Sequence, residues 1–385
     1  MADLGTSENY LRTMYVNPSS NNARAIFEQG NWQFEPHPAL ANFVWMRHKY
    51  QQMFHHLRQG QLLNHIPCES AICDKGHLTR HLQVFDSISS EDHISLSDFY
   101  PETYCLYRKD HYQAFLKQVP TKDSPDNLWI LKPTNESRGV GVRVIWELNK
   151  LKEKLLYPQK NVTGLDVDLS SRYVIQRYIQ NPLLLEGHKS EIRLYWLIAC
   201  LDPLLVLLYK EGTTRRNASP FQLGEFDNPL VHITNIYQQK KHHPDADSLT
   251  LKWNFAQLQS YLTDELQLAA PHYIQTRLKP QWKKMLSFVV SSTKKTLMRR
   301  PNNGHFWGLY GADVILDAQL RPWLTEVQIG PGLSHDDAVK KGVIPNVVSE
   351  AAEIVLEVQA RKRKGASLRC LDAMDGFEWV INEAV

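Results

Sequence analysis

The segment YGADVILDAQLRPWLTEVQ, Tyr310 to Gln328, constrains the fold more than any other part of the sequence. Its two apolar runs are separated by Asp317, Ala318 and Gln319, a pattern that predicts two antiparallel strands joined by a short turn. A second pair of apolar runs, IRLYWLIAC and LLVLLY, flanks Asp202-Pro203 and predicts another hairpin. A chain with these two hairpins is expected to be built around a β-sheet.

Helical segments are interleaved with these strands. Two stretches carry apolar residues at a spacing of three or four, which predicts amphipathic helices. Their members are Trp282, Met285, Val289 and Val290 in the first stretch, and Val347, Ala351, Ile354, Val355 and Val358 in the second. The runs NLWILKP, VRVIW and RYVIQRYI predict three more strands. The pattern predicts an α+β or α/β fold.

The two ends of the chain carry weaker signals. The first third is irregular and rich in aromatic residues and His, and we predict one helix in it, over Ala41 to Gln59. After Gly365, Phe377, Trp379 and Ile381 stand among acidic residues, so this tail is expected to dock as a short helix or strand.

Composition excludes several classes of protein. The 44 Lys and Arg against 41 Asp and Glu leave a net charge of +3, which does not indicate nucleic acid as the main partner. Five cysteines without a paired CxxC pattern favour a reducing compartment over a zinc site. The N-terminus has no basic region followed by an apolar one, and no run is long enough to span a membrane. We therefore expect a cytoplasmic protein.

The strand pair around Asp313 has the composition of a magnesium site. Glu326 and Gln328 are two residues apart and share one face of a strand. Asp313 lies on the neighbouring strand of the predicted hairpin. Two carboxylates and an amide suit magnesium, a hard cation that takes oxygen ligands. Taken alone, the same residues are also consistent with an ordinary polar strand end.

The segment LWILKPTNESRGVGV has the features of a phosphate-covering loop. Lys132 ends a predicted strand, and Arg138, Gly139 and Gly141 follow within a few residues. Glycines let the backbone approach a polyphosphate closely, and the lysine would neutralise its charge. The segment matches neither the P-loop nor the GxGxxG pattern. By itself it fits a flexible hairpin loop equally well.

Alternating charges mark a third candidate region. Lys189, Glu191 and Arg193 share one face of a predicted strand, and Arg215 lies near the end of the next. Burying three cations beside one carboxylate is costly unless an anionic ligand is bound. Phosphate or carboxylate substrates meet that requirement, and a surface ladder of ion pairs is the alternative.

In this order, the segments resemble the tubulin-tyrosine ligase-like family, a branch of the ATP-grasp ligases. The resemblance covers about Asn64 to Leu333. It rests on NHIPCESAICDKGHL, DFYPETYCL, LWILKP with SRGVGV, VIQRYIQNPLLLEGHKSEIR, YKEGTTR, VHITN and the strand pair that ends in EVQ. The departures from the family pattern include Ser190 in place of Phe, and two of them lengthen a side chain: Glu191 in place of Asp, and Gln328 in place of Asn.

The resemblance implies an ATP-grasp fold that binds the nucleotide between a central and a C-terminal lobe. It implies an N-terminal domain over 1–95, the two lobes over 96–186 and 187–365, and a tail over 366–385. It assigns Arg193, Arg215 and Glu326 to catalysis, and Asp313, Glu326 and Gln328 to magnesium. It assigns the remaining positions to ATP: Lys75, Lys132, Arg138, Gly139, Gly141, Gln176, Arg177, Tyr178, Ile179, Lys189, Glu191 and Asn235.

The implied activity is an ATP-dependent ligase that adds an amino acid, most often glutamate in this family, to tubulin tails through an acyl phosphate. The implied partners are tubulin or microtubules and a free amino acid. The implied location is the cytoplasm, including the cytoskeleton or the cilium, and the enzyme is expected to be a monomer. Because two departures lengthen a side chain at the site, an inactive member that binds tubulin or nucleotide is an alternative. A ligase with a different protein acceptor is another.

Overall fold

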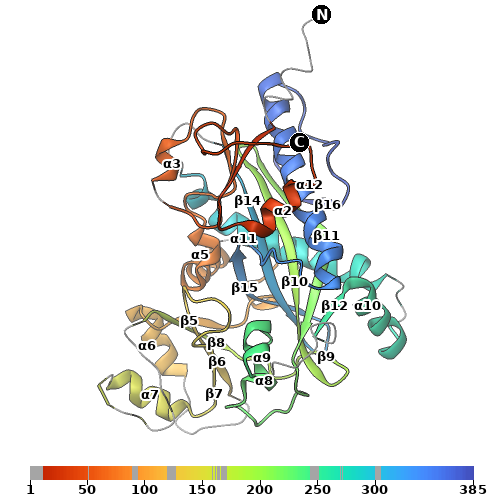
Figure 1. The fold of residues 1–385 in the computed structure, drawn as a ribbon. Coiled ribbons are helices and arrows are strands. Elements are labelled where there is room, and N and C mark those ends of the chain that lie inside the picture. Colours follow the sequence, from red (N-terminus) through yellow and green to blue (C-terminus); the bar gives the residue numbers. More distant parts are fainter. Residues whose placement is uncertain are drawn as a thin grey trace, which may run out of the picture.

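The computed structural model describes residues 12–50, 52–88, 94–118, 127–157, 159–160, 162, 165, 171–242, 251–268, 270, 272–299 and 305–385. The first eleven residues of the N-terminal segment considered above lie outside this part. The described residues form three sheets with helices packed against them, a mixed α+β architecture as predicted (Figure 1). No helix among them is long and apolar enough to cross a membrane.

A seven-stranded antiparallel sheet forms the centre of the molecule. Its order is β12 (Lys252–Asn254), β11 (Leu204–Arg216), β10 (His188–Leu201), β14 (Gly308–Leu316) and β15 (Pro322–Ile329), with β9 (Leu184–Leu185) on β10 and β16 (Phe377–Asn382) on β11. Both predicted hairpins are confirmed as β10–β11 and β14–β15. The C-terminal tail docks as a strand, β16.

The two long predicted helices are confirmed, and they cover opposite faces of this sheet (Figure 1). Alternate residues of β10 point to opposite faces. Trp196 packs in one core with α11 (Lys279–Leu297), and Leu197 packs in the other with α12 (Ala338–Lys364). Burial on both faces explains why β10 reads as a continuous apolar run rather than an alternating one.

A four-stranded antiparallel sheet carries the glycine-bearing loop. Its order is β5 (Thr103–Cys105), β8 (Tyr173–Arg177), β6 (Trp129–Pro133) and β7 (Arg143–Ile145), so the three predicted short strands are confirmed. Its apolar face packs on α6 (Lys109–Gln118) and α7 (Leu148–Leu156) through a core that contains Phe115, Trp129 and Leu151. Lys132 and Gln176 hydrogen bond to each other outside this core.

The third sheet is parallel and uses very short strands. Its order is β13 (His305–Phe306), β4 (Leu62–Leu63), β3 (Phe43–Trp45), β1 (Thr13–Val16) and β2 (Gln33–Phe34). The prediction of a helix over Ala41 to Gln59 is wrong: the segment forms β3 and only one helical turn, α3 (Met53–His56). Phe43, Val44 and Trp45 are all buried, as expected of a strand enclosed on both faces of a parallel sheet.

Shorter helices connect these sheets: α2 (Asn21–Phe27), α4 (Ser70–Cys73), α5 (Lys75–Ile88), η1 (Leu96–Asp98), α8 (Pro229–His232), α9 (Ile236–His242), α10 (Phe255–Ser260), η2 (Tyr261–Glu265) and η3 (Ile274–Leu278). The predicted division into lobes at residues 95, 186 and 365 stays a prediction. Two strands pair across those limits: β13 pairs with β4 in the parallel sheet, and β16 pairs with β11 in the central sheet.

Candidate active site

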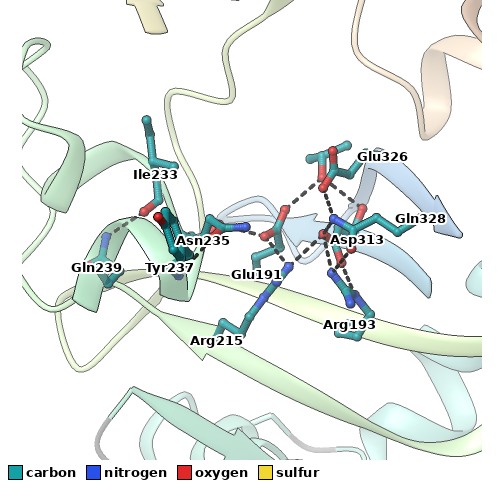
Figure 2. Close-up of polar contacts among 12 residues, drawn as sticks. Glu191, Arg193, Arg215, Ile233, Asn235, Tyr237, Gln239, Asp313, Glu326 and Gln328 are labelled. Carbon is teal, nitrogen blue, oxygen red and sulfur yellow. Dashed lines mark hydrogen bonds and ion pairs between the residues drawn. The ribbon is translucent and has the colours of Figure 1, made fainter. Parts of the chain in front are cut away.

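A row of charged side chains crosses one face of the central sheet. The pairing register places Arg215 opposite Glu191, and Asp313 opposite both Arg193 and Glu326. Directly paired residues share a face of the sheet. The catalytic and metal residues predicted from the sequence therefore come together on four adjacent strands (Figure 2).

Asp313 lies at the centre of this row and is 1% exposed. Arg193 binds both of its carboxylate oxygens, with a distance of 3.0 Å from Nη2 to Oδ2, and Arg215 Nη2 lies 2.8 Å from Oδ2. Burial alone would raise the pKa of Asp313, but the two arginines hold it well below its usual range. Asp313 is therefore an anion that fixes two cations in position.

Glu326 and Gln328 share one face, as predicted, and their side chains are in contact. The Gln328 amide nitrogen donates to Glu326 Oε1 and lies 3.4 Å from Asp313 Oδ2, and its oxygen accepts from Arg193 Nη2 at 2.9 Å. Lys75, at the start of α5, forms an ion pair of 3.1 Å with Glu326 Oε2. Asp313, Glu326 and Gln328 thus form one connected group.

Glu191 is held by donors from three segments of the chain: β11, the connection between α8 and α9, and β15. Its Oε2 accepts from Arg215 Nη2 and from the Thr234 hydroxyl, each at 2.7 Å, and its Oε1 accepts from the Thr325 hydroxyl at 2.9 Å. Sequence reasoning missed both threonines. Thr234 directly precedes Asn235 in the VHITN segment, and this position is a signal that could have identified it. The orientation of the Thr325 side chain depends on an irregular pairing of β14 and β15, which a sequence pattern does not reveal.

Lys132 connects the four-stranded sheet to this row. Its Nζ donates to Gln176 Oε1 at 2.8 Å and to the Thr325 carbonyl at 3.3 Å. Gln176 is itself held by Thr103 at 2.9 Å. Burial lowers the pKa of Lys132 to about 8, although Glu326 acts in the opposite direction.

Lys189 belongs to a separate buried triad. Its Nζ donates to the Tyr178 hydroxyl at 2.9 Å, and that hydroxyl lies 2.8 Å from His232 Nδ1. Burial lowers the pKa of Lys189 to about 7. Burial and the charge of Lys189 lower the pKa of His232 to about 4, so the imidazole is neutral and its Nδ1 accepts the tyrosine proton. His232 is a third residue that sequence reasoning missed.

The glycine-bearing loop contacts helix α9. Arg138, Gly139 and Gly141 all have positive φ values of 59° to 70°. The Arg138 guanidinium lies over the Tyr237 ring at 5.5 Å, and Gln238 donates to the Arg138 carbonyl at 3.0 Å. The loop therefore contacts the beginning of α9, close to Asn235.

Two predicted residues, Arg177 and Asn235, make other side-chain contacts. Arg177 pairs with Glu102 at 3.0 Å and lies over the Trp129 ring, and the Asn235 side chain caps the backbone of Tyr237. Arg177, Tyr178 and Ile179 line a cavity of about 780 Å³, which also contacts α5 and Trp323. None of the charged side chains of the central row lines that cavity, so it is distinct from the row.

The assembled site carries excess positive charge. Four basic side chains, Lys75, Lys132, Arg193 and Arg215, converge on three carboxylates, which are Glu191, Asp313 and Glu326. The Nε of Arg215 is buried and has no hydrogen-bond partner among the described residues. An unfilled cationic donor is costly to bury, so the site is suited to an anionic ligand.

The donor set fits a hard divalent cation in part. Asp313 and Glu326 offer carboxylate oxygens, the ligand type that magnesium prefers. The Gln328 amide presents its nitrogen to them and its oxygen to Arg193. No group of three or more His, Cys, Asp and Glu in the described ranges is placed to hold a metal. Magnesium here would be coordinated by two carboxylates and by oxygens of water or of a ligand. Gln328 would be a further ligand only if its amide group rotated so that the oxygen faced the metal.

Sequence comparison identifies the family. The profile of the tubulin-tyrosine ligase family matches residues 53–364. The chain belongs to the tubulin-tyrosine ligase family. The resemblance inferred from the motifs is thereby confirmed, and the three sheets described above are consistent with the ATP-grasp-like fold of that family.

Relatives within the tubulin-tyrosine ligase family are similar over most of this chain. "Probable tubulin polyglutamylase TTLL9" of Rattus norvegicus is 25% identical over 343 residues, which cover 80% of this chain and 70% of the relative. "Probable alpha-tubulin polyglutamylase Ttll1" of Tetrahymena thermophila is 25% identical over 314 residues, 78% of this chain and 73% of the relative. The human "Tubulin monoglutamylase TTLL4" is 27% identical over 333 residues, which make up 81% of this chain but 25% of that larger protein.

Proposed function

We propose that this protein is an ATP-dependent ligase that joins glutamate to a carboxylate of tubulin tails through an acyl phosphate. The observation that carries the proposal is the pair Arg193 and Arg215 on buried Asp313, with the Nε of Arg215 left without a partner. Such a cationic group suits a transferring phosphoryl group. The names of the relatives, which refer to tubulin glutamylation, supply the acceptor and the amino acid.

The nucleotide would lie between the four-stranded sheet and the central sheet. Lys75 and Lys132 would neutralise its phosphates, and Arg138, Gly139 and Gly141 would close over them. The adenine end would lie near Gln176, Arg177, Tyr178 and Ile179, with Lys189 beside them; Glu191 and Asn235 would line the same site. Asp313 and Glu326 would hold magnesium, and Gln328 is the third ligand that the sequence predicts. Bound magnesium would draw charge from the phosphate oxygens.

The chemistry would proceed in two steps. The acceptor carboxylate attacks the γ-phosphorus of ATP, the bond to ADP breaks, and an acyl phosphate forms. The amino group of glutamate then attacks the acyl carbon, phosphate leaves, and an amide remains. Arg193 and Arg215 act by position and charge in the first step, because they stabilise the oxygens of the transferring group. This activity requires access to tubulin, so we propose that the protein works in the cytoplasm or at cytoskeletal structures such as the cilium. We propose that it acts as a monomer.

A labelled-amino-acid assay tests the proposal. Purified protein is incubated with ATP, magnesium, tubulin and labelled glutamate, glycine or tyrosine in parallel. Incorporation of glutamate into tubulin is expected, and the Glu326→Gln variant serves as the inactive control. Nucleotide binding without any incorporation would instead identify a non-catalytic binding protein, and labelling of other proteins alone would identify a different acceptor. Either result overturns the proposal.

A further inference from the structure

Thr325 occupies a bulge in the strand that carries Glu326. Asp313 pairs with Glu326, but Val314 pairs with Leu324, so Thr325 is an extra residue with no partner on β14. A bulge interrupts the alternation of side chains and redirects the residue at that position. In a regular strand, Thr325 would point to the face opposite Glu326.

The bulge turns the Thr325 side chain into the site. The residue is 8% exposed, and its hydroxyl lies 2.9 Å from Glu191 Oε1 and 3.1 Å from the Asp313 carbonyl oxygen. Its own carbonyl lies 3.3 Å from Lys132 Nζ, where it accepts a hydrogen bond. One residue therefore contacts the four-stranded sheet, β10 and β14 at once.

The contact depends on the length of Glu191. With one oxygen on Arg215 and Thr234 and the other on Thr325, the carboxylate is held on both sides and cannot rotate freely. An aspartate at this position would be shorter by one methylene, so its carboxylate would lie closer to the backbone of β10 and would not keep both contacts unless the backbone or the partners moved. The Thr325 hydroxyl is thus matched to the glutamate of this chain.

We propose that Thr325 is a positioning residue, whose hydroxyl fixes the Glu191 carboxylate and thereby directs Arg215 toward the anionic ligand. The proposal rests on the proposed function for the identity of that ligand, the transferring phosphoryl group of ATP. Thr325 itself touches no reacting atom. Its effect passes through Glu191, and this indirect route is what an experiment can measure.

The first test removes the hydroxyl without changing the shape of the side chain. Thr325→Val is expected to lower kcat/KM for ATP about tenfold, because a buried carboxylate oxygen loses its donor. Thr325→Ser keeps the hydroxyl and is expected to stay within about threefold of the wild type. Thr293→Val is the matched control: that buried hydroxyl donates to the Val289 carbonyl on α11, away from the site, and its loss should leave kcat/KM unchanged.

The second test is a double-mutant cycle with Glu191→Asp. If Thr325 acts through Glu191, the double variant should be no worse than Glu191→Asp alone, because a shortened carboxylate leaves the hydroxyl nothing to position. Multiplication of the two single losses would overturn the proposal, since it would show that Thr325 acts independently of Glu191. A merely structural role predicts such independent losses.

The cycle is also measured on the affinity for magnesium and a non-hydrolysable ATP analogue, by calorimetry. This separates the two proposals. A wild-type protein that binds the analogue but incorporates no amino acid refutes the ligase, whereas coupling between Thr325 and Glu191 in the binding data still supports the positioning role. Absence of coupling in an active ligase refutes the positioning role alone, and a wild-type protein that shows neither incorporation nor binding refutes both.

Discussion

Lys132 and Lys189 are buried beside the site where the nucleotide is proposed to bind, and burial lowers their pKa values to about 8 and about 7. At a pH above these values, the two lysines of the free protein lose their protons, whereas a bound polyphosphate would stabilise the protonated, charged forms. Nucleotide binding at pH 8 should therefore take up protons, and affinity should fall as the pH rises from 7 to 10. Calorimetry in two buffers of different ionisation enthalpy measures the uptake, and Lys132→Met should reduce it. A binding enthalpy that is the same in both buffers would refute this prediction.

Glu326 and Gln328 make different predictions, although they share one strand face. Glu326→Gln removes a carboxylate from the proposed metal position and should lower the incorporation rate by about a hundredfold or more, without loss of fold. The fold is checked by circular dichroism and by the midpoint of denaturant unfolding. If Glu326→Gln kept most of the activity, the metal assignment would be wrong.

Gln328→Asn should preserve or raise the activity. The shorter side chain cannot contact Arg193 and Glu326 at the same time, so the carboxylates would be more available to bind magnesium. The rate of labelled-amino-acid incorporation measures this change. A loss of activity in Gln328→Asn would show that the longer amide has a required role as a bridge between the carboxylates and Arg193.

At the scale of elements, β16 completes the central sheet on β11. Phe377 is 3% exposed and meets the Tyr209 ring edge-on at 4.9 Å. Phe377→Ala should lower the free energy of unfolding by about 3 kcal/mol or more, because it leaves a cavity under the strand. Denaturant unfolding measures the loss. Glu383→Ala, which removes only a partly exposed pair with Lys294, should cost less than about 1 kcal/mol. Equal costs would show that β16 is not an integral strand.

The elements that sequence predicts well are those whose signal is local. Strands β10 and β11 are long apolar runs on either side of Asp202-Pro203, so their pairing follows from the hairpin. By contrast, β4 and β13 are two residues long and pair Leu62 with His305 across more than two hundred positions. Such strands are too short for a periodic pattern, and the prediction of a helix around Phe43 fails for the same reason, because β3 has only three residues.

The same distinction applies to the site. The grouping of Asp313, Glu326 and Gln328 can be predicted from the sequence, because a hairpin and a two-residue spacing place them together. The Tyr178 contact with His232 joins residues 54 positions apart, and Thr325 enters through a bulge. A sequence pattern predicts regular alternation, so it assigns a bulged residue to the wrong face.

At the scale of the whole molecule, the site is where separate parts of the chain meet. Lys75 reaches Glu326 from α5, and Lys132 reaches the Thr325 carbonyl from the four-stranded sheet. Both contacts are polar, and Glu326 offsets only part of the repulsion between the two lysines. The free protein should therefore be less stable than the protein with a nucleotide that neutralises this charge.

Ligand-dependent stability tests this organisation. A ligand that binds only the folded state stabilises it by about 2.7 kcal/mol at a hundred times its dissociation constant. We expect a non-hydrolysable ATP analogue with magnesium to raise the free energy of unfolding by this amount, measured in denaturant. In Glu326→Gln the analogue alone should still stabilise, but magnesium should add little, because one of the two carboxylates is gone. An analogue that stabilised the wild type equally with and without magnesium would show that Asp313 and Glu326 serve only to hold the arginines and lysines in place.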